Sequence, residues 1–180
     1  QDIERISIPA KTSCTVAMGM VVKPSIDLVV ACGILGNGFS GRLMKWVRDT
    51  KGLTYGIGSK VKRENGTAVM RIVATFAPSV LDEGMKETTK VLDKWFKADV
   101  TQQEVDIQKQ ILLGKRLVHF DNPSSIIATL HNASVHGHGV KTLDNFSAKV
   151  NSVTLRSVRA AIQALDKNNL KTVIAGTFTS

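Results

Sequence analysis

The 180-residue sequence has few cysteines, few aromatic residues and no long hydrophobic run. Two cysteines, Cys14 and Cys32, are too few for a disulfide framework. The longest apolar run, residues 28–35, falls far short of the ~20 residues that span a membrane, so we expect no membrane span. The composition, 43% hydrophobic and 22% charged, excludes a disordered chain. The length of 180 residues predicts one domain over residues 1–180.

The net charge of +9 raises the question of a nucleic-acid partner. The basic residues do not cluster, however, and the aromatic residues, 5% of the chain, form no stacking set with them. We therefore expect no nucleic-acid partner. A solvated basic surface, or one that meets an acidic peptide or an acidic partner domain, accounts for the charge.

Hydrophobic periodicity predicts an order of strand, strand, helix, helix, hairpin, several helices and a closing strand. This order is typical of an α+β fold, a two-layer sandwich in which several helices pack on a largely antiparallel sheet. Strands are predicted over 5–8, 15–22, 53–61, 67–76 and 171–178. Helices are predicted over 28–35, 40–51, 79–97, 101–118, from 122 onward, over 142–150, and from either Ser152 or Thr154 to 166.

Several local signals sharpen this prediction. Thr101 with Glu104 has the spacing of a capping box, and Ser40 is expected to cap the second helix. Asn65-Gly66 predicts a hairpin turn. Strict alternation predicts that one strand is half-buried through Leu53, Tyr55, Ile57, Ser59 and Val61, and helical spacing predicts that another element buries Ile126, Ile127 and Leu130.

Residues 36–41 read Gly-Asn-Gly-Phe-Ser-Gly, a literal G-x-G-x-x-G between an apolar run and a helix. That context is typical of a dinucleotide site. A hairpin follows where a doubly wound fold needs a crossover helix, and Lys62-Arg63 occupies the region where a ribose-binding acid is expected. The basic pair could suit a 2′-phosphate, so an NADP-type nucleotide-binding module remains an alternative.

Other catalytic patterns are weak. His131, His136 and His138 lack the spacing of a metal site, and neither H-E-x-x-H nor H-x-x-E-H occurs. We expect these histidines to lie in loops, His119 to be structural, and this chain to hold no metal. Neither cysteine has an evident low-pKa setting, and no G-x-S-x-G occurs, which excludes nucleophilic catalysis.

Arg48 and Tyr55 flank a predicted helix-to-strand turn at Gly52. A guanidinium and a phenol on one side of such a junction can donate hydrogen bonds to carbonyl oxygens. They could therefore bind a peptide backbone or stabilise charge that develops on a carbonyl oxygen. The alternative is structural: an arginine lying over a helix end and a tyrosine half inside the core.

The run from Gly36 to Gly56, GNGFSGRLMKWVRDTKGLTYG, resembles the signature of the C-terminal, Arg/Tyr-bearing domain of insulinase/pitrilysin-type zinc peptidases, the inverzincins. The resemblance implies a two-layer α+β domain that forms the substrate-binding half of a metallo-endopeptidase with a clam-shell chamber. It implies that Arg48 orients the peptide and that Tyr55 hydrogen-bonds the scissile carbonyl.

The same resemblance implies that zinc is held by an H-x-x-E-H motif in a separate N-terminal domain or partner subunit. This chain lacks that motif and begins with Gln1, so we expect a fragment or subunit that is inactive alone. A catalytically inactive scaffold subunit of the same fold remains an alternative. The family is compatible with a periplasmic or a mitochondrial location.

Overall fold

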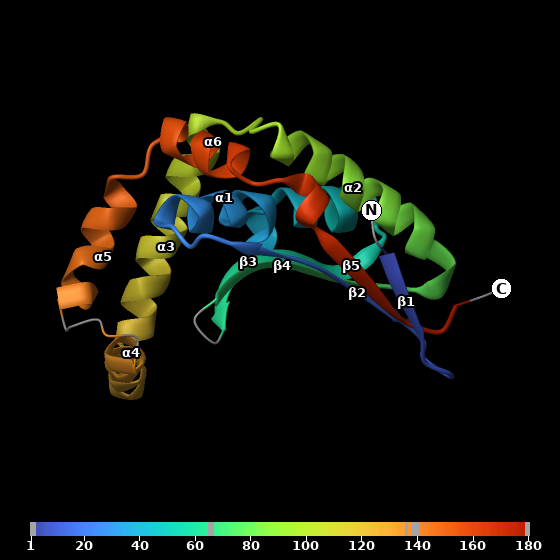
Figure 1. Cartoon of the computed structure of the whole chain (residues 1–180), viewed down its shortest axis with the longest axis horizontal. Helices are drawn as coiled ribbons and strands as arrows, with labels where there is room; N and C mark the ends of the chain where they lie inside the picture. The colour runs from blue at the N-terminus through green and yellow to red at the C-terminus, as the bar shows by residue number, and fades with distance from the viewer. Residues whose placement is uncertain (1–2, 65–66, 136, 138–140, 179–180) are drawn as a thin grey trace.

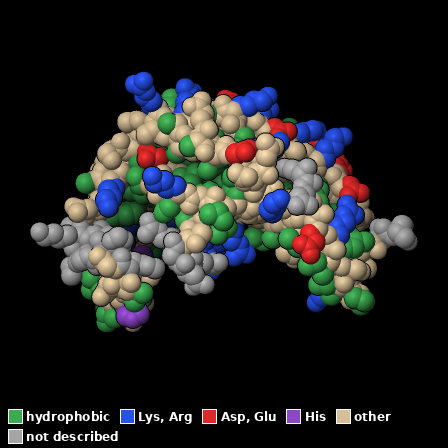
Figure 2. Space-filling model, in the orientation of Figure 1, with side chains coloured by type: hydrophobic (Ala, Val, Ile, Leu, Met, Phe, Trp, Pro, Cys, Tyr) green, Lys and Arg blue, Asp and Glu red, His purple; other side chains and the backbone are tan. Residues whose placement is uncertain are grey.

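Residues 3–64, 67–135, 137 and 141–178 are described by the computed structural model. One layer is a five-stranded sheet, and the other consists of helices that cover one face of that sheet (Figure 1). The opposite face of the sheet lies on the concave side of the molecule, which a space-filling view shows as a hollow (Figure 2). The predicted α+β two-layer architecture is confirmed.

The strands occur in the order β1-β5-β2-β4-β3 across the sheet. β1 pairs parallel with β5, whereas the other neighbours are antiparallel. The sheet is therefore largely antiparallel, as predicted, with β1 and β3 at its edges. The strands are β1 (Ile3–Ser7), β2 (Cys14–Val22), β3 (Thr54–Glu64), β4 (Thr67–Phe76) and β5 (Lys171–Gly176).

Three helices, α1, α2 and α6, lie over the sheet, whereas α3, α4 and α5 form an arm that extends beyond it (Figure 1). The α-helices are α1 (Ile26–Gly36), α2 (Leu81–Phe96), α3 (Gln102–Phe120), α4 (Pro123–Val135), α5 (Lys141–Asn151) and α6 (Leu155–Gln163). Short helical turns complete the layer: η1 (Gly38–Ser40), the π-helical η2 (Met44–Thr50), η3 (Pro78–Val80) and η4 (Lys167–Asn169).

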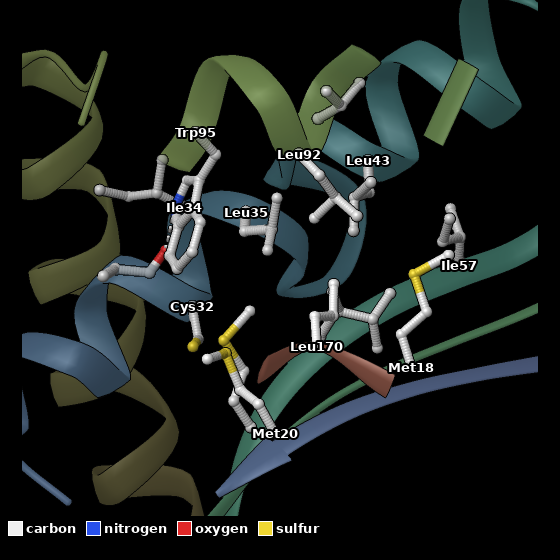
Figure 3. Close-up of a cluster of buried hydrophobic side chains, with 14 of the residues drawn as sticks. Met18, Met20, Cys32, Ile34, Leu35, Leu43, Ile57, Leu92, Trp95 and Leu170 are labelled. Atoms are coloured by element: carbon white, nitrogen blue, oxygen red, sulfur yellow. Dashed lines mark hydrogen bonds between the residues drawn. The ribbon is translucent and has the colours of Figure 1, made fainter. Parts of the chain in front are cut away.

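The core lies between the sheet and the helix layer (Figure 3). Met18 and Met20 project from β2 toward Leu35 of α1, and Leu43 closes the cluster near η2. The indole of Trp95, fully buried, donates a hydrogen bond to the carbonyl of Ala31 over 3.0 Å. This contact joins α2 to α1 and satisfies the one polar atom of a large buried side chain.

Most of the helix starts that local sequence signals predicted are present in the structure. Thr101 and Glu104 form the predicted capping box of α3, and Thr154 caps α6. The expectation that Ser40 caps the second helix is wrong, because its hydroxyl donates to the carbonyl of Asn37 within the η1 turn. Asn65-Gly66 lies outside the described residues.

The expected burial of the α4 apolar residues is also wrong. Ile127 is 67% exposed, and Ile126 and Leu130 are only half-buried. The reason is tertiary: α4 packs against α3 in the arm and extends away from the sheet, so no second layer covers it (Figure 1).

Candidate functional site

Arg48 stands in the last turn of η2, which the core holds in place. Leu43 and Val47 are fully buried beneath it. Arg42, just before η2, forms a bidentate pair with Glu104 of α3, with N–O distances of 2.6 and 2.7 Å. Planar two-point pairing of this kind fixes orientation as well as position. The start of the helical segment that carries Arg48 is thus tied to the first turn of α3.

The end of η2 is set by Gly52, as the sequence predicted. Gly52 adopts φ +65°, a left-handed conformation that glycine accepts without strain, and its amide donates to the carbonyl of Arg48 over 2.8 Å. The amide of Lys51 reaches back five residues to the carbonyl of Trp46 over 3.0 Å, the spacing of a π-helix. π-Helical turns occur frequently at functional sites.

The Arg48 side chain is 37% exposed and lies against Phe39 of η1, with the guanidinium carbon 5.2 Å from the ring centroid. Its Nε lies 3.9 Å from the carboxylate of Asp49. Phe39 is itself 74% exposed. Sequence reasoning treated Phe39 only as part of a glycine-rich turn. The available signal was a large aromatic residue between Gly38 and Ser40, inside a glycine-rich segment.

Tyr55 occupies a β-bulge near the start of β3. Thr54 pairs with Phe76 and Gly56 pairs with Thr75, which leaves Tyr55 without a partner in the register. Its side chain is 99% exposed. The prediction that Tyr55 alternates into a half-buried face with Ile57 is therefore wrong, because the extra residue of the bulge reverses the alternation at this point.

The hydroxyl of Thr54 stabilises this bulge. It accepts a hydrogen bond from the amide of Gly56 over 3.1 Å and donates to the carbonyl of Thr75 over 2.5 Å. The phenol of Tyr55 is consequently held away from the core by backbone geometry. Arg48 and Tyr55 lie on either side of the Gly52 turn, and no hydrogen bond or ring contact joins the two side chains in the described part of the chain.

Two of the three glycines in residues 36–41, Gly36 and Gly41, serve packing in this fold, whereas Gly38 adopts φ +61° in the turn. The motif follows a helix, α1, instead of the strand that a dinucleotide site requires. A Cβ on Gly36 would lie 2.5 Å from the amide nitrogen of Ser59, and one on Gly41 would lie 2.6 Å from Cα of Gly36. The absence of side chains therefore lets α1 approach β3. The structural premise of the nucleotide-binding alternative is wrong.

A groove of about 610 Å³ lies between η2 and α2. Behind it, the buried carboxylate of Glu87 accepts hydrogen bonds from the indole of Trp46 over 2.7 Å and from Lys90 over 2.5 Å. These bonds, that from Lys90 first, hold the pKa of Glu87 below its ordinary value. The hydrogen bond between Trp46 and Glu87 thus links η2, which carries Arg48, to α2.

Within the described ranges, no group of three or more histidine, cysteine, aspartate or glutamate side chains could hold a metal ion. The ring Nε2 of His119 lies 3.1 Å from the hydroxyl of Thr129, a contact between α3 and α4 that fits a structural role. His131 lies within α4, not in the loop that we expected. His136 and His138 lie outside the described residues.

The cysteines are buried and unpaired. Burial raises the pKa of Cys32 to about 12, which leaves the thiol protonated and unreactive at neutral pH. Cys14 donates a weak hydrogen bond to the carbonyl of Thr177 over 3.4 Å. Both cysteines act as small apolar residues.

Known proteins resemble this chain in sequence and in fold. A family model described as the peptidase M16 inactive domain matches residues 4–112. An uncharacterized zinc protease of Mycobacterium tuberculosis is 25% identical over 131 residues, which cover 73% of this chain and 30% of that protein. A non-peptidase homolog of Helicobacter pylori is 25% identical over 134 residues, which cover 73% of this chain and 30% of that protein.

The fold also matches a solved structure, the peptidase M16 inactive domain from Pseudomonas fluorescens. It has a TM-score of 0.88 and 24% identity, and the match covers 99% of this chain and 44% of that one. The chain spans about a third of the length of the curated relatives it matches. Among the described helices, none combines the length and the apolar character needed to cross a bilayer.

Proposed function

Because this chain belongs to the family of M16 peptidase inactive domains, as the resemblance of residues 36–56 predicted, we propose that it is the substrate-binding half of a zinc metallo-endopeptidase. Residues 1–180 act as one domain of this enzyme. The reaction is hydrolysis of a peptide bond inside a chamber formed with a second, zinc-bearing half.

The observation that carries this proposal is the exposure of Tyr55. A tyrosine hydroxyl on an ordinary strand position of the inner face would be buried, whereas the bulge presents it fully to solvent. Exposing an entire aromatic side chain contributes nothing to the core, so the geometry favours a binding role. The phenol donates a hydrogen bond to the scissile carbonyl oxygen, and that bond strengthens as negative charge develops there.

Arg48 orients the peptide backbone. Its guanidinium carries five N–H donors in a planar fork, and backbone carbonyl oxygens are suitable acceptors. The Phe39 ring at 5.2 Å restricts the guanidinium through a cation–π contact. A restricted side chain loses less conformational entropy when it binds, which supports a positioning role for Arg48.

Zinc belongs to the other half of the enzyme. The described residues offer no cluster that fits the ion, and relatives of which the match covers only 30% are named zinc proteases. Zinc, when bound there, supplies an activated water. This chain binds the substrate and the carbonyl oxygen and requires a fused or separate zinc-bearing partner for turnover.

The test is native mass spectrometry with zinc analysis on the protein isolated from its own source, followed by a peptide-hydrolysis assay. We expect this chain to be attached to, or bound with, a polypeptide that contains zinc. Hydrolysis should stop on chelation and return with added zinc. Isolation of the chain alone, free of zinc and without activity, would contradict the proposal.

A second candidate is an inactive scaffold subunit of the same fold. The relative from Helicobacter pylori that is named a non-peptidase homolog favours it, since it matches this chain at the same identity as the mycobacterial zinc protease. The two functions differ in one outcome: a scaffold tolerates Tyr55→Phe without any change in the assembled protein.

A further inference from the structure

We propose that the open face of the sheet selects acidic peptides through Lys60 and Arg71. This inference rests on the proposed function and names the substrate class that the site binds. It arises from the register of the sheet, which places basic residues in one row on the face that the helices leave uncovered (Figures 1 and 2).

The row crosses four strands. Lys60 of β3 pairs with Arg71 of β4, Arg71 pairs with Gly19 of β2, and Gly19 pairs with Lys171 of β5. The residues on either side of Arg71, Met70 and Ile72, are buried against the helices, so Arg71 projects to the opposite face. Register thus gathers cations that are widely separated in the sequence.

Gly19 leaves the flank of Arg71 open. A Cβ at this position would meet its nearest neighbours, the carbonyl of Met70 and a methyl of Val69, at 3.6 and 3.7 Å, which are ordinary contact distances. Packing therefore does not require glycine here. A glycine inside a strand is typical of a place where a ligand or another backbone approaches closely.

Lys60 and Arg71, the two cations on which this inference rests, have no acidic counterpart close by. Neither Lys60 nor Arg71 forms a hydrogen bond or an ion pair within the described residues. The outward positions of β2, β4 and β5, and of β3 as far as Lys62, hold no aspartate or glutamate. Glu4 is level with this face on β1, three strands from β4 and thus about 14 Å away.

The row also stands at a defined distance from Tyr55. Lys60 follows Tyr55 by five residues on the same strand, which corresponds to about 16 Å at the rise of an extended chain. An extended peptide that runs along β3 with its scissile carbonyl at Tyr55 therefore brings a side chain about five residues from the cleaved bond toward Lys60. We expect selection for aspartate or glutamate near that position.

The experiment uses the full-length protein and a series of fluorescein-labelled peptides that carry Glu, Gln or Lys at each position within seven residues of the cleaved bond. Cleavage gives kcat/KM, and fluorescence anisotropy of the zinc-depleted protein gives Kd whether or not cleavage occurs. We expect Glu to exceed Lys by roughly fivefold per cation engaged, the upper range for solvent-exposed ion pairs. Raising the salt concentration should reduce this preference.

The variant Lys60→Gln with Arg71→Gln should abolish the preference for acidic peptides in both measurements and leave neutral peptides unchanged. Lys86→Gln, which removes an exposed charge from α2 in the helix layer, is the matched control and should retain the preference. Equal binding of acidic and basic peptides, or a preference that survives in the double variant, would overturn the inference. Cleavage without charge preference would leave the proposed function intact, whereas charge-selective binding without cleavage would contradict only the proposed function.

Discussion

The hydroxyl of Thr54 lies 2.5 Å from the carbonyl oxygen of Thr75, and this bond across the β3–β4 pair stabilises the bulge at Tyr55. The same hydroxyl accepts from the amide of Gly56, so one side chain fixes the backbone on both sides of the tyrosine. The position of Tyr55 therefore depends on a neighbour that touches neither peptide nor metal in this account.

Thr54→Val tests this dependence, because valine matches threonine in shape and lacks the hydroxyl. We expect a loss of about 1 kcal/mol in the free energy of unfolding from the lost hydrogen bonds. We also expect kcat to fall by up to ~10²-fold through misplacement of Tyr55. Thr75→Val, in which the exposed side chain changes and the accepting carbonyl remains, is the control and should leave kcat unchanged.

A double-mutant cycle separates positioning from simple destabilisation. In a Tyr55→Phe background, Thr54→Val should lower kcat very little, because the hydroxyl that it positions is already absent. Additive losses in kcat would contradict the positioning role.

Two glycine substitutions test the close approach of α1 to β3. Gly36→Ala places a Cβ 2.5 Å from the amide nitrogen of Ser59, and we expect overpacking to cost about 1–3 kcal/mol of stability. Gly114→Ala, at an exposed position inside α3 with nothing within 4 Å, should instead stabilise the protein by roughly 0.5–1 kcal/mol. Thermal melts of both variants check the prediction, and a stabilising Gly36→Ala would contradict the packing explanation.

The Glu87 contacts predict an acid-dependent stability. The pKa of Glu87 is lowered in the folded protein, so its contribution is complete above the unfolded pKa, about 4.3, and is lost as pH falls through the lower folded value. Glu87→Gln should therefore lower the melting temperature at pH 7 and approach the wild type as the pH is lowered below 4. A difference in melting temperature that stays constant from pH 7 to pH 3 would contradict this assignment.

The sequence predicted features that depend on nearby residues better than features that depend on distant ones. The capping box of Thr101 and the glycine ending at Gly52 depend on residues within one turn, and both were predicted. The bulge at Tyr55 was missed because the carbonyl that accepts from Thr54 lies 21 residues away, on β4. The exposure of Ile127 was missed because periodicity shows that a helix has an apolar face but not whether another layer covers it.

The sequence identified the candidate residues, but it did not predict which side chains and backbone conformations surround them. The spacing of Arg48 and Tyr55 across Gly52 was evident, and the family resemblance gave it meaning. Neither source indicated that η2 is π-helical or that Phe39 lies against the guanidinium. Both features depend on the backbone conformation of the segment from η1 through η2, which hydrophobic periodicity does not specify.

In the proposed enzyme, the Tyr55 hydroxyl stabilises the carbonyl oxygen of the cleaved bond. The most direct test of this role is the single-turnover rate of peptide cleavage by the zinc-loaded full-length protein carrying Tyr55→Phe. We predict a fall of up to ~10²–10³-fold, with an unchanged melting temperature because the hydroxyl is exposed. A rate within twofold of the wild type would contradict this role of Tyr55 and favour the scaffold function.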